Sequence, residues 1–377
     1  MRRPIAIFGV FLVLAAVVWG ACAYLDIGGQ RQLFHFEGRH LLSDYYMPWK
    51  CANEGYAQPP ELEYTAPDGR TLVMSARDRC YPAFALLPHR LLPFSVAGGI
   101  AYSLSGGVIL LLALVMIAKG RLWPLVLAGS MPFIHALERG NSAWFCAVAI
   151  AVFLAWWDDE SKGRRIVAAV CLAVAALLKI TPAALGLLYL FPRERGKNLD
   201  LTSMSVAAGT AVVLFVLPWL AMPNGFSDMP LFLSQARENG IHHIQFADFG
   251  LIQLWRAVRV TLGQELARPW PGMIAVSSVS QAIGFAALVF GAFRRRYVLM
   301  VGGILLAAGN MHYYGALYLL PVFVLEVSRG EKEISWTRLL LWAALLCPFR
   351  FAFMGHGVNF VLGNLAVMAL MGRDALK

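Results

Sequence analysis

The sequence predicts an all-α polytopic membrane protein, with about 10–12 transmembrane helices and two long external loops that carry interfacial helices. Hydrophobic residues make up 59% of the chain and charged residues 14%, with a mean hydropathy of +0.62. Soluble domains contain about 25% charged residues, so one soluble core could not bury this much apolar surface. The apolar residues form repeated stretches, and basic residues recur in alternate loops between them.

The individual spans are predicted from apolar stretches that end at charged or helix-breaking residues. The first span, Pro4 to Leu25, follows Arg2 and Arg3 and is too long for a typical signal-peptide core, so we expect a retained anchor. The predicted spans lie near residues 4–25, 94–118, 122–136, 142–157, 166–178, 180–192, 202–221, 272–293, 297–310, 313–328, 336–353 and 357–372.

The basic residues predict the orientation of these spans in a plasma (inner) membrane. One set of short loops is repeatedly basic, and such loops usually face the cytoplasm, so the N-terminus is predicted to be cytoplasmic. This pattern explains the net charge of +10 better than nucleic-acid binding does, because no continuous basic patch with interleaved aromatic residues occurs. The basic loops contain Lys119 and Arg121; Lys162, Arg164 and Arg165; Arg193, Arg195 and Lys197; Arg294, Arg295 and Arg296; and Arg329 and Lys332.

The opposite side receives two long loops, residues 26–93 and 222–271, within a single membrane domain that spans residues 1–377. Aromatic and charged residues mix at Leu33–Phe36, Tyr45–Trp49 and Phe246–Trp255, which predicts short helices along the membrane surface.

Two neighbouring spans in the middle of the chain, 166–178 and 180–192, are short and have Pro182 near their junction. Broken helices are tolerated where they meet protein or water, so we expect a recessed polar cavity that opens to the external side.

Cysteine and histidine positions indicate no metal site and no cofactor. Cys51 and Cys80 share the first long loop and could form a disulfide if that side is oxidising. His242 and His243 are adjacent, so their side chains diverge and do not suit one metal ion. No metal-binding spacing, phosphate-binding loop or dinucleotide-binding glycine pattern occurs, and Gly302-Gly303 is explained by close helix packing.

Asp44 is the first candidate for a general base. It lies between the apolar pair Leu41-Leu42 and the aromatic run from Tyr45, where partial burial would hold a carboxylate near a substrate. The alternative is that Asp44 or Ser43 caps an interfacial helix.

Other candidate site residues lie at corners between spans. Arg139 and Asn141 follow an apolar stretch, and a charge at membrane depth suggests a function, although a solvated corner is equally consistent. Lys179 ends an apolar helix and suits a phosphate, or it could extend to the interface. His312 and the neighbouring Tyr313 lie at the outer end of a later span.

Taken in order, these motifs resemble glycosyltransferase family 87, whose members are of the GT-C type and use polyprenyl-phosphate sugars. The first motif is Ser43-Asp44-Tyr45-Tyr46, followed by Cys80-Tyr81-Pro82-Ala83-Phe84. The second is Glu138-Arg139-Gly140-Asn141, followed by Lys179-Ile180-Thr181-Pro182, and the third is Asn310-Met311-His312-Tyr313-Tyr314. The family's usual Gln is Arg139 here, which leaves the role of that corner open.

The resemblance implies a GT-C-like bundle and a hexosyltransferase that is inverting. The donor would be a polyprenyl-phosphate-linked sugar, with mannose as the first candidate, and the acceptor a glycan or glycolipid on the external face. Asp44 would then be the base, and Lys179, Arg139, His312, Asn141 and Tyr313 would bind the donor phosphate or substrate. A transporter or flippase of lipid-linked sugars is the alternative, although no internal repeat is present.

Overall fold

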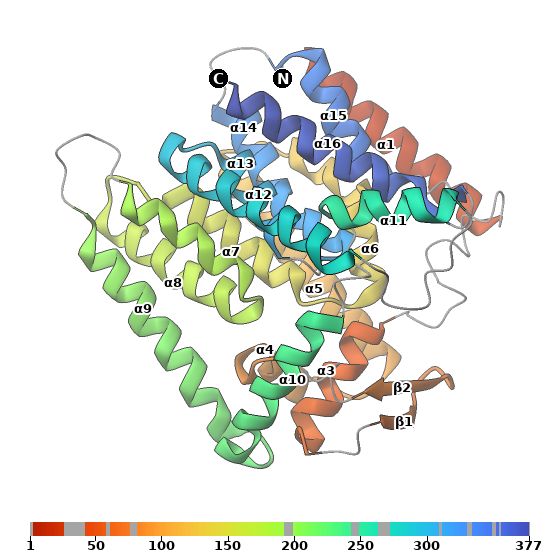
Figure 1. The fold of residues 1–377 in the computed structure, drawn as a ribbon, viewed down its shortest axis with the longest axis vertical. Helices are drawn as coiled ribbons and strands as arrows, with labels where there is room; N and C mark the ends of the chain where they lie inside the picture. The colour runs from red at the N-terminus through yellow and green to blue at the C-terminus, as the bar shows by residue number, and fades with distance from the viewer. Residues whose placement is uncertain are drawn as a thin grey trace.

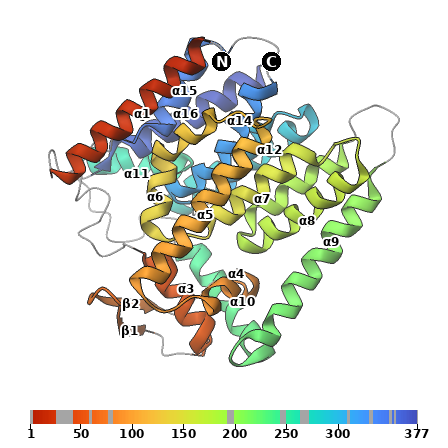
Figure 2. The same ribbon diagram turned by 180° about the vertical axis from the view of Figure 1, so that it is seen from behind.

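This computed structural model of the chain describes residues 3–25, 42–57, 61–75, 81–191, 199–242, 249–262, 272–308, 311–329, 334–348, 352–353 and 356–376. The described chain is almost entirely helical, as predicted. Both termini lie at one end of the bundle, and α3, α4, α10 and a small β-hairpin lie together at the other end (Figures 1 and 2).

Every predicted span overlaps one helix or two consecutive helices, but the span predicted at 336–353 extends beyond its helix, α15, which ends at Leu346. In the described residues, four helical stretches are long and apolar enough to cross a membrane unaided: Pro4–Cys22, Val96–Ile117, Leu201–Ala221 and Met273–Arg294. The other predicted spans are shorter, and at about 1.5 Å per residue they do not cross a bilayer core of about 30 Å alone. Protein surrounds many of them, since nearly all of α13 and most of α7 are buried.

The first half of the chain supplies α3, α4 and the β-hairpin at one end of the bundle, together with several of the central helices. Its elements are α1 (Arg3–Tyr24), α3 (Ser43–Glu54), β1 (Glu61–Thr65), β2 (Thr71–Ser75), α4 (Ala83–Leu91), α5 (Val96–Ile117), η4 (Trp123–Gly129), α6 (Met131–Arg139), α7 (Ala143–Trp156), α8 (Lys162–Leu178) and η5 (Thr181–Leu190).

The second half adds both exposed helices, such as α9, and buried ones, such as α13. Its elements are α9 (Leu201–Val216), η6 (Leu217–Ala221), η7 (Gly225–Ser227), α10 (Asp228–His242), α11 (Leu251–Thr261), α12 (Met273–Arg294), α13 (Tyr297–Ala307), η9 (Tyr313–Tyr318), α14 (Leu319–Arg329), α15 (Trp336–Leu346), β3 (Ala352–Phe353), β4 (His356–Gly357) and α16 (Val358–Ala375).

Proline divides several of the short spans. Pro182 lies in the first turn of η5, where it needs no backbone donor, and the helix before it has already ended at Leu178. Pro132 plays the same part at the start of α6. The break that was predicted between 166–178 and 180–192 is therefore present, and it places Lys179 at the junction.

Glycines allow α12 and α13 to pack backbone to backbone. A Cβ atom on Gly284 would lie 2.5 Å from the Ala307 nitrogen and 2.7 Å from the Gly303 oxygen. A Cβ atom on Gly303 would lie 2.6 Å from the Gly284 oxygen. Only glycine fits at this crossing, as expected for a helix pair that associates through small residues.

The hairpin of β1 and β2 was not predicted. Its strands pair antiparallel, with Tyr64 opposite Leu72, and the side chains of Tyr64, Leu72 and Met74 are buried. The signal was present in Ala66-Pro67-Asp68-Gly69, a turn sequence between two alternating runs. Gly69 has a φ of 85°, and Asp68 accepts a hydrogen bond from the Arg70 nitrogen at 3.2 Å.

The two long loops contact each other. The Tyr56 nitrogen, just after α3, donates to Asp228 Oδ1 at the start of α10 at 3.3 Å. The Tyr56 ring packs on Trp219 and Phe232, at centroid distances of 5.6 and 6.1 Å. The helices expected around Tyr45–Trp49 and Phe246–Trp255 are present as α3 and as α11, which begins at Leu251. Residues 33–36 and 243–248 lie outside the described residues.

The disulfide between Cys51 and Cys80 stays a prediction. Cys51 is buried in α3, and Cys80 lies outside the described residues.

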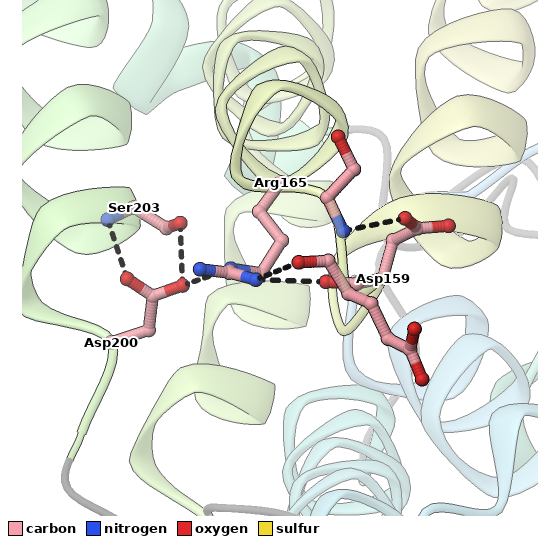
Figure 3. Close-up of polar contacts among 6 residues, drawn as sticks. Asp159, Arg165, Asp200 and Ser203 are labelled. Carbon is pink, nitrogen blue, oxygen red and sulfur yellow. Dashed lines mark hydrogen bonds and ion pairs between the residues drawn. The ribbon is translucent and has the colours of Figure 1, made fainter.

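The basic first turn of α8 has acidic partners (Figure 3). Arg165 Nε donates to Asp200 Oδ2 at 2.9 Å, and its Nη1 donates to the Asp159 carbonyl at 2.9 Å. Asp200 also caps α9, because its Oδ1 accepts from the Ser203 nitrogen at 3.0 Å. These contacts tie α8 to α9 at the end of α8 remote from Lys179.

A second ionic cluster joins the last helices. Arg338 on α15 is 6% exposed, and its guanidinium donates to both oxygens of Asp374 on α16, at 2.6 and 3.3 Å. It also forms an ion pair with Glu326 on α14. The cluster therefore connects three helices through one cation.

Candidate active site

Asp44 lies in the first turn of α3, where the helix dipole favours a negative charge. Leu42, the residue just before α3, has a φ of 54°, and this left-handed conformation reverses the chain at the start of the helix. The Leu42 nitrogen donates to the Glu138 carbonyl at 2.7 Å, so the start of α3 is bound to the end of α6. No side chain caps α3. The capping interpretation of Asp44 therefore does not describe this helix.

The corner that faces Asp44 depends on Gly140. This residue has a φ of 66°, and its nitrogen donates to the Ala136 carbonyl at 3.1 Å, which ends α6 in a left-handed turn. A Cβ atom on Gly140 would lie 3.0 Å from Tyr45 Cβ, so glycine also allows α3 to approach. The turn directs Arg139 and Asn141 toward the same carboxylate.

Asp44 is bound by both corner residues. Arg139 donates from Nη2 to Oδ1 at 2.7 Å and from Nε to Oδ2 at 3.2 Å, a two-point contact between guanidinium and carboxylate. Asn141 Nδ2 donates to Oδ2 at 2.6 Å. The Asn141 amide is oriented because its Oδ1 accepts from the Ala143 nitrogen at 2.9 Å, at the start of α7.

The environment of Asp44 keeps it ionised. Burial alone would raise the pKa of this carboxyl. The charge of Arg139, the hydrogen bonds from Arg139 and Asn141, and the charge of Lys179 outweigh burial and lower the pKa to about 2. Asp44 is therefore a carboxylate at neutral pH, but in this arrangement it is a weak base.

Lys179 is the second cation of the cluster. Its Nζ lies 5.7 Å from the ring centroids of both Tyr81 and Tyr314, within the range of cation–π attraction. The phenols of the same two tyrosines act on the charge of Arg139. The two cations therefore flank one pair of aromatic rings.

Tyr314 is a site residue that the sequence argument passed over in favour of Tyr313. Its ring contacts His312 at 5.6 Å and His135 at 6.1 Å, and its hydroxyl lies within hydrogen-bonding reach of Asn141. Thus His312 reaches the cluster through Tyr314.

Tyr313 faces the opposite way. Its hydroxyl donates to the Leu345 carbonyl at 2.6 Å, and its ring stacks on Phe249 at 5.6 Å. These contacts place it in the helix core, and none of them reaches Asp44.

An aromatic wall, formed by Tyr45, His89 and Tyr102, packs beside Asp44. Tyr45 packs against His89 and Tyr102 at centroid distances of 5.4 and 5.6 Å, and its hydroxyl donates to the Pro93 carbonyl at 2.7 Å. Burial lowers the pKa of His89 to about 3, more than the nearby carbonyls raise it, so this ring is neutral. The wall fixes α3 and leaves the cations on the open side of Asp44.

An apolar groove borders the start of η5, the element that follows Lys179. It has a volume of about 370 Å³ between η5, α12 and α13, and it is lined by Ile180, the residue after Lys179. A second apolar hollow of about 500 Å³ adjoins it, since Phe285 lines both, and extends to Phe293. In the described residues, no group of three His, Cys, Asp or Glu could hold a metal ion.

Comparison with protein families decides the affiliation. The model of glycosyltransferase family 87 matches residues 81–309. The chain belongs to glycosyltransferase family 87. Neither a curated protein nor a solved structure matches it.

Membership of family 87 makes the chain a membrane glycosyltransferase and favours this class over a transporter. The match covers Arg139, Asn141 and Lys179. It begins after Asp44 and ends before His312, so the case for these two residues rests on the contacts above.

Proposed function

We propose that this family 87 glycosyltransferase moves a hexose from a polyprenyl-phosphate carrier to a hydroxyl of a glycan or glycolipid. The reaction would take place on the non-cytoplasmic face, with inversion at the anomeric carbon. The supporting observations are one cluster that holds a buried carboxylate and two cations, and an apolar groove that is lined by the residue following Lys179.

Asp44 is the proposed general base. The acceptor hydroxyl gives its proton to the carboxylate while its oxygen forms a bond to the anomeric carbon. The bond from that carbon to the phosphate oxygen breaks, and its electron pair leaves with the polyprenyl phosphate. Because attack and departure occur on opposite sides of the sugar, the configuration inverts.

Lys179 and Arg139 are proposed to stabilise the leaving phosphate, which gains negative charge as the bond breaks. Preorganised donors at such a position are commonly the largest contribution to catalysis. Asn141 and His312 hold this environment in place, through Asp44 and Tyr314 respectively. Phosphate is a good leaving group, so the mechanism requires no strong acid.

The polyprenyl tail is proposed to occupy the apolar groove. Ile180 lines the groove and follows Lys179 directly, so a phosphate at Lys179 continues into an apolar passage between η5 and α12. Isoprene units match the Phe, Leu and Ile side chains there by the hydrophobic effect. Mannose is the first sugar to test, on the strength of the family resemblance.

Sugar transfer in purified membranes tests this function. A panel of polyprenyl-phosphate-linked hexoses is offered with a glycolipid extract as acceptor to wild type, to Asp44→Asn and to a control, Asp68→Asn. Asp68 belongs to the same loop but pairs with Arg70 in the hairpin turn. We expect transfer by wild type and control, and a loss of about 10² to 10⁴-fold in Asp44→Asn.

Other outcomes would redirect the assignment. Equal transfer by all three proteins would place the base elsewhere in a working transferase. Absence of transfer with every donor, from protein that is folded, would contradict the donor class and return attention to flipping of lipid-linked sugars.

A further inference from the structure

Hydrogen bonds from Arg139 and Asn141 occupy three of the acceptor positions of the Asp44 carboxylate, and Ser43 makes a long contact with the fourth. The two carboxylate oxygens offer about four lone-pair sites. Arg139 occupies one on each oxygen, Asn141 occupies a second on Oδ2, and Ser43 Oγ lies 3.4 Å from Oδ1. An acceptor hydroxyl must donate to one of these oxygens before it can lose its proton. At least one present donor therefore has to leave.

Arg139 is the donor whose departure changes the chemistry. Asn141 is held by its own bond to the Ala143 nitrogen. Ser43 makes only the long contact, and its loss would leave both bonds from the guanidinium in place. Removal of Arg139 vacates a site on each oxygen, and it also removes the charge that most strongly opposes proton uptake by Asp44.

A donor phosphate would give Arg139 an alternative partner. Arg139 and Lys179 flank the same rings, Tyr81 and Tyr314, so an anion near Lys179 lies within the surroundings of Arg139. The two cations and Asp44 leave one excess positive charge, and a sugar phosphodiester carries one negative charge. The planar guanidinium suits two-point binding to phosphate as well as to carboxylate.

We propose that Arg139 is a positioning residue that exchanges partners, holding Asp44 in the free enzyme and moving to the donor's phosphodiester when the donor binds. This inference rests on the proposed function. It implies an order: Asp44 becomes available to the acceptor hydroxyl only after the donor is in place. The groups that face Asp44 during this exchange are Lys179 after α8, Tyr102 on α5 and Tyr314 on η9.

Binding of polyprenyl monophosphate, which cannot react, tests the exchange without turnover. The decisive pair is Asp44→Asn and the double variant Asp44→Asn/Arg139→Gln. Neither protein buries an unpaired carboxylate at this position. If Arg139 only supports Asp44, replacing Arg139 does not change the affinity for polyprenyl monophosphate in a protein that already carries Asp44→Asn. If Arg139 binds the phosphate, the double variant loses affinity by on the order of tenfold to a hundredfold.

Wild type and two further double variants complete the experiment. Asp44→Asn alone should bind more tightly than wild type, because the competing carboxylate is absent. Asp44→Asn/Arg139→Lys should recover part of the affinity, since the charge returns without the two-point geometry. Asp44→Asn/Arg70→Gln, which removes an arginine of the hairpin, should match Asp44→Asn. Thermal unfolding without ligand confirms that each protein is folded.

Two results would refute the partner exchange of Arg139, and one of them would also refute the proposed function. Equal affinity of Asp44→Asn and Asp44→Asn/Arg139→Gln, with clear binding by wild type, would refute the exchange and leave the glycosyltransferase proposal intact. Absence of polyprenyl-phosphate binding by every folded protein would refute both.

Discussion

The ion pair between Asp44 and Arg139 predicts unequal effects when either partner is removed. The Asp44 side chain is 8% exposed and the Arg139 side chain 22%. Arg139→Gln therefore leaves an anion in the less hydrated position. Asp44→Asn leaves a cation that water can reach and that lies near the phenols of Tyr81 and Tyr314.

The expected magnitudes follow from this difference. Breaking a buried ion pair by removing one partner costs about 3–5 kcal/mol, and we expect Arg139→Gln to fall in this range. The lowered pKa of Asp44 is consistent with a contribution of this order. Its fall from 3.8 to about 2 corresponds to about 2 kcal/mol of stabilisation of the folded state above pH 4, at about 1.4 kcal/mol per pKa unit. For Asp44→Asn we expect about 1–3 kcal/mol, from the lost charged hydrogen bonds.

The stability of wild type and that of Arg139→Gln should change in opposite directions with pH. In wild type the folded-state pKa lies below the unfolded value, so the stabilisation is present above pH 4 and is lost as pH falls toward 2. In Arg139→Gln the strongest opposing charge is absent and burial raises the pKa. The penalty is then full at pH 8 and is relieved as the pH falls through the raised folded-state pKa.

Thermal unfolding followed by tryptophan fluorescence in detergent measures these effects. Wild type, both single variants and the double variant are compared at pH 8 and pH 5, at one scan rate because unfolding of such proteins is commonly irreversible. The double variant should be less impaired than the sum of the single variants. The reasoning fails if Arg139→Gln is as stable as Asp44→Asn at pH 8, or if its deficit grows on acidification.

Three other substitutions test packing and ion pairing away from the Asp44 cluster. Gly284→Ala places a Cβ atom 2.5 Å from a backbone nitrogen of α13, and should lower the stability by about 1–3 kcal/mol in the same unfolding assay; an unchanged midpoint would contradict the close crossing. Tyr313→Phe removes the bond to the Leu345 carbonyl and should cost about 1 kcal/mol while transfer activity persists; a large activity loss at unchanged stability would return Tyr313 to the site. Asp374→Asn leaves Arg338 with Glu326 as its remaining acidic partner and should cost about 1–3 kcal/mol without raising the KM for donor; a raised KM would show that the cluster acts on the site.

Much of the helical architecture could be predicted because each span is a local pattern. An apolar run that ends at Arg or Pro has nearly the same bounds in the sequence and in the structure, as α5 and α12 show. The hairpin was missed because the loop was read for membrane-surface helices, although its turn sequence was visible.

The sequence indicated candidate residues for the site but not their geometry. Asp44 was a candidate because it lies between an apolar pair and an aromatic run, and Arg139 and Lys179 because they carry charges at the ends of apolar segments. Their mutual contacts depend on how α3 docks on α6, across 95 positions of sequence. No local pattern fixes such a distance. The choice between Tyr313 and Tyr314 depended on the rotation of η9, where successive residues point about 120° apart.

The main-chain bond from Leu42 to Glu138 connects two parts of the protein that are synthesised at different times. Asp44 emerges well before the corner that holds Arg139, and Lys179 follows later. A chain whose first long loop has not docked thus carries a carboxylate with neither cation beside it. If the proposed mechanism holds, chemical competence arises last, after all three segments have met, so that an incompletely inserted enzyme cannot consume its donor.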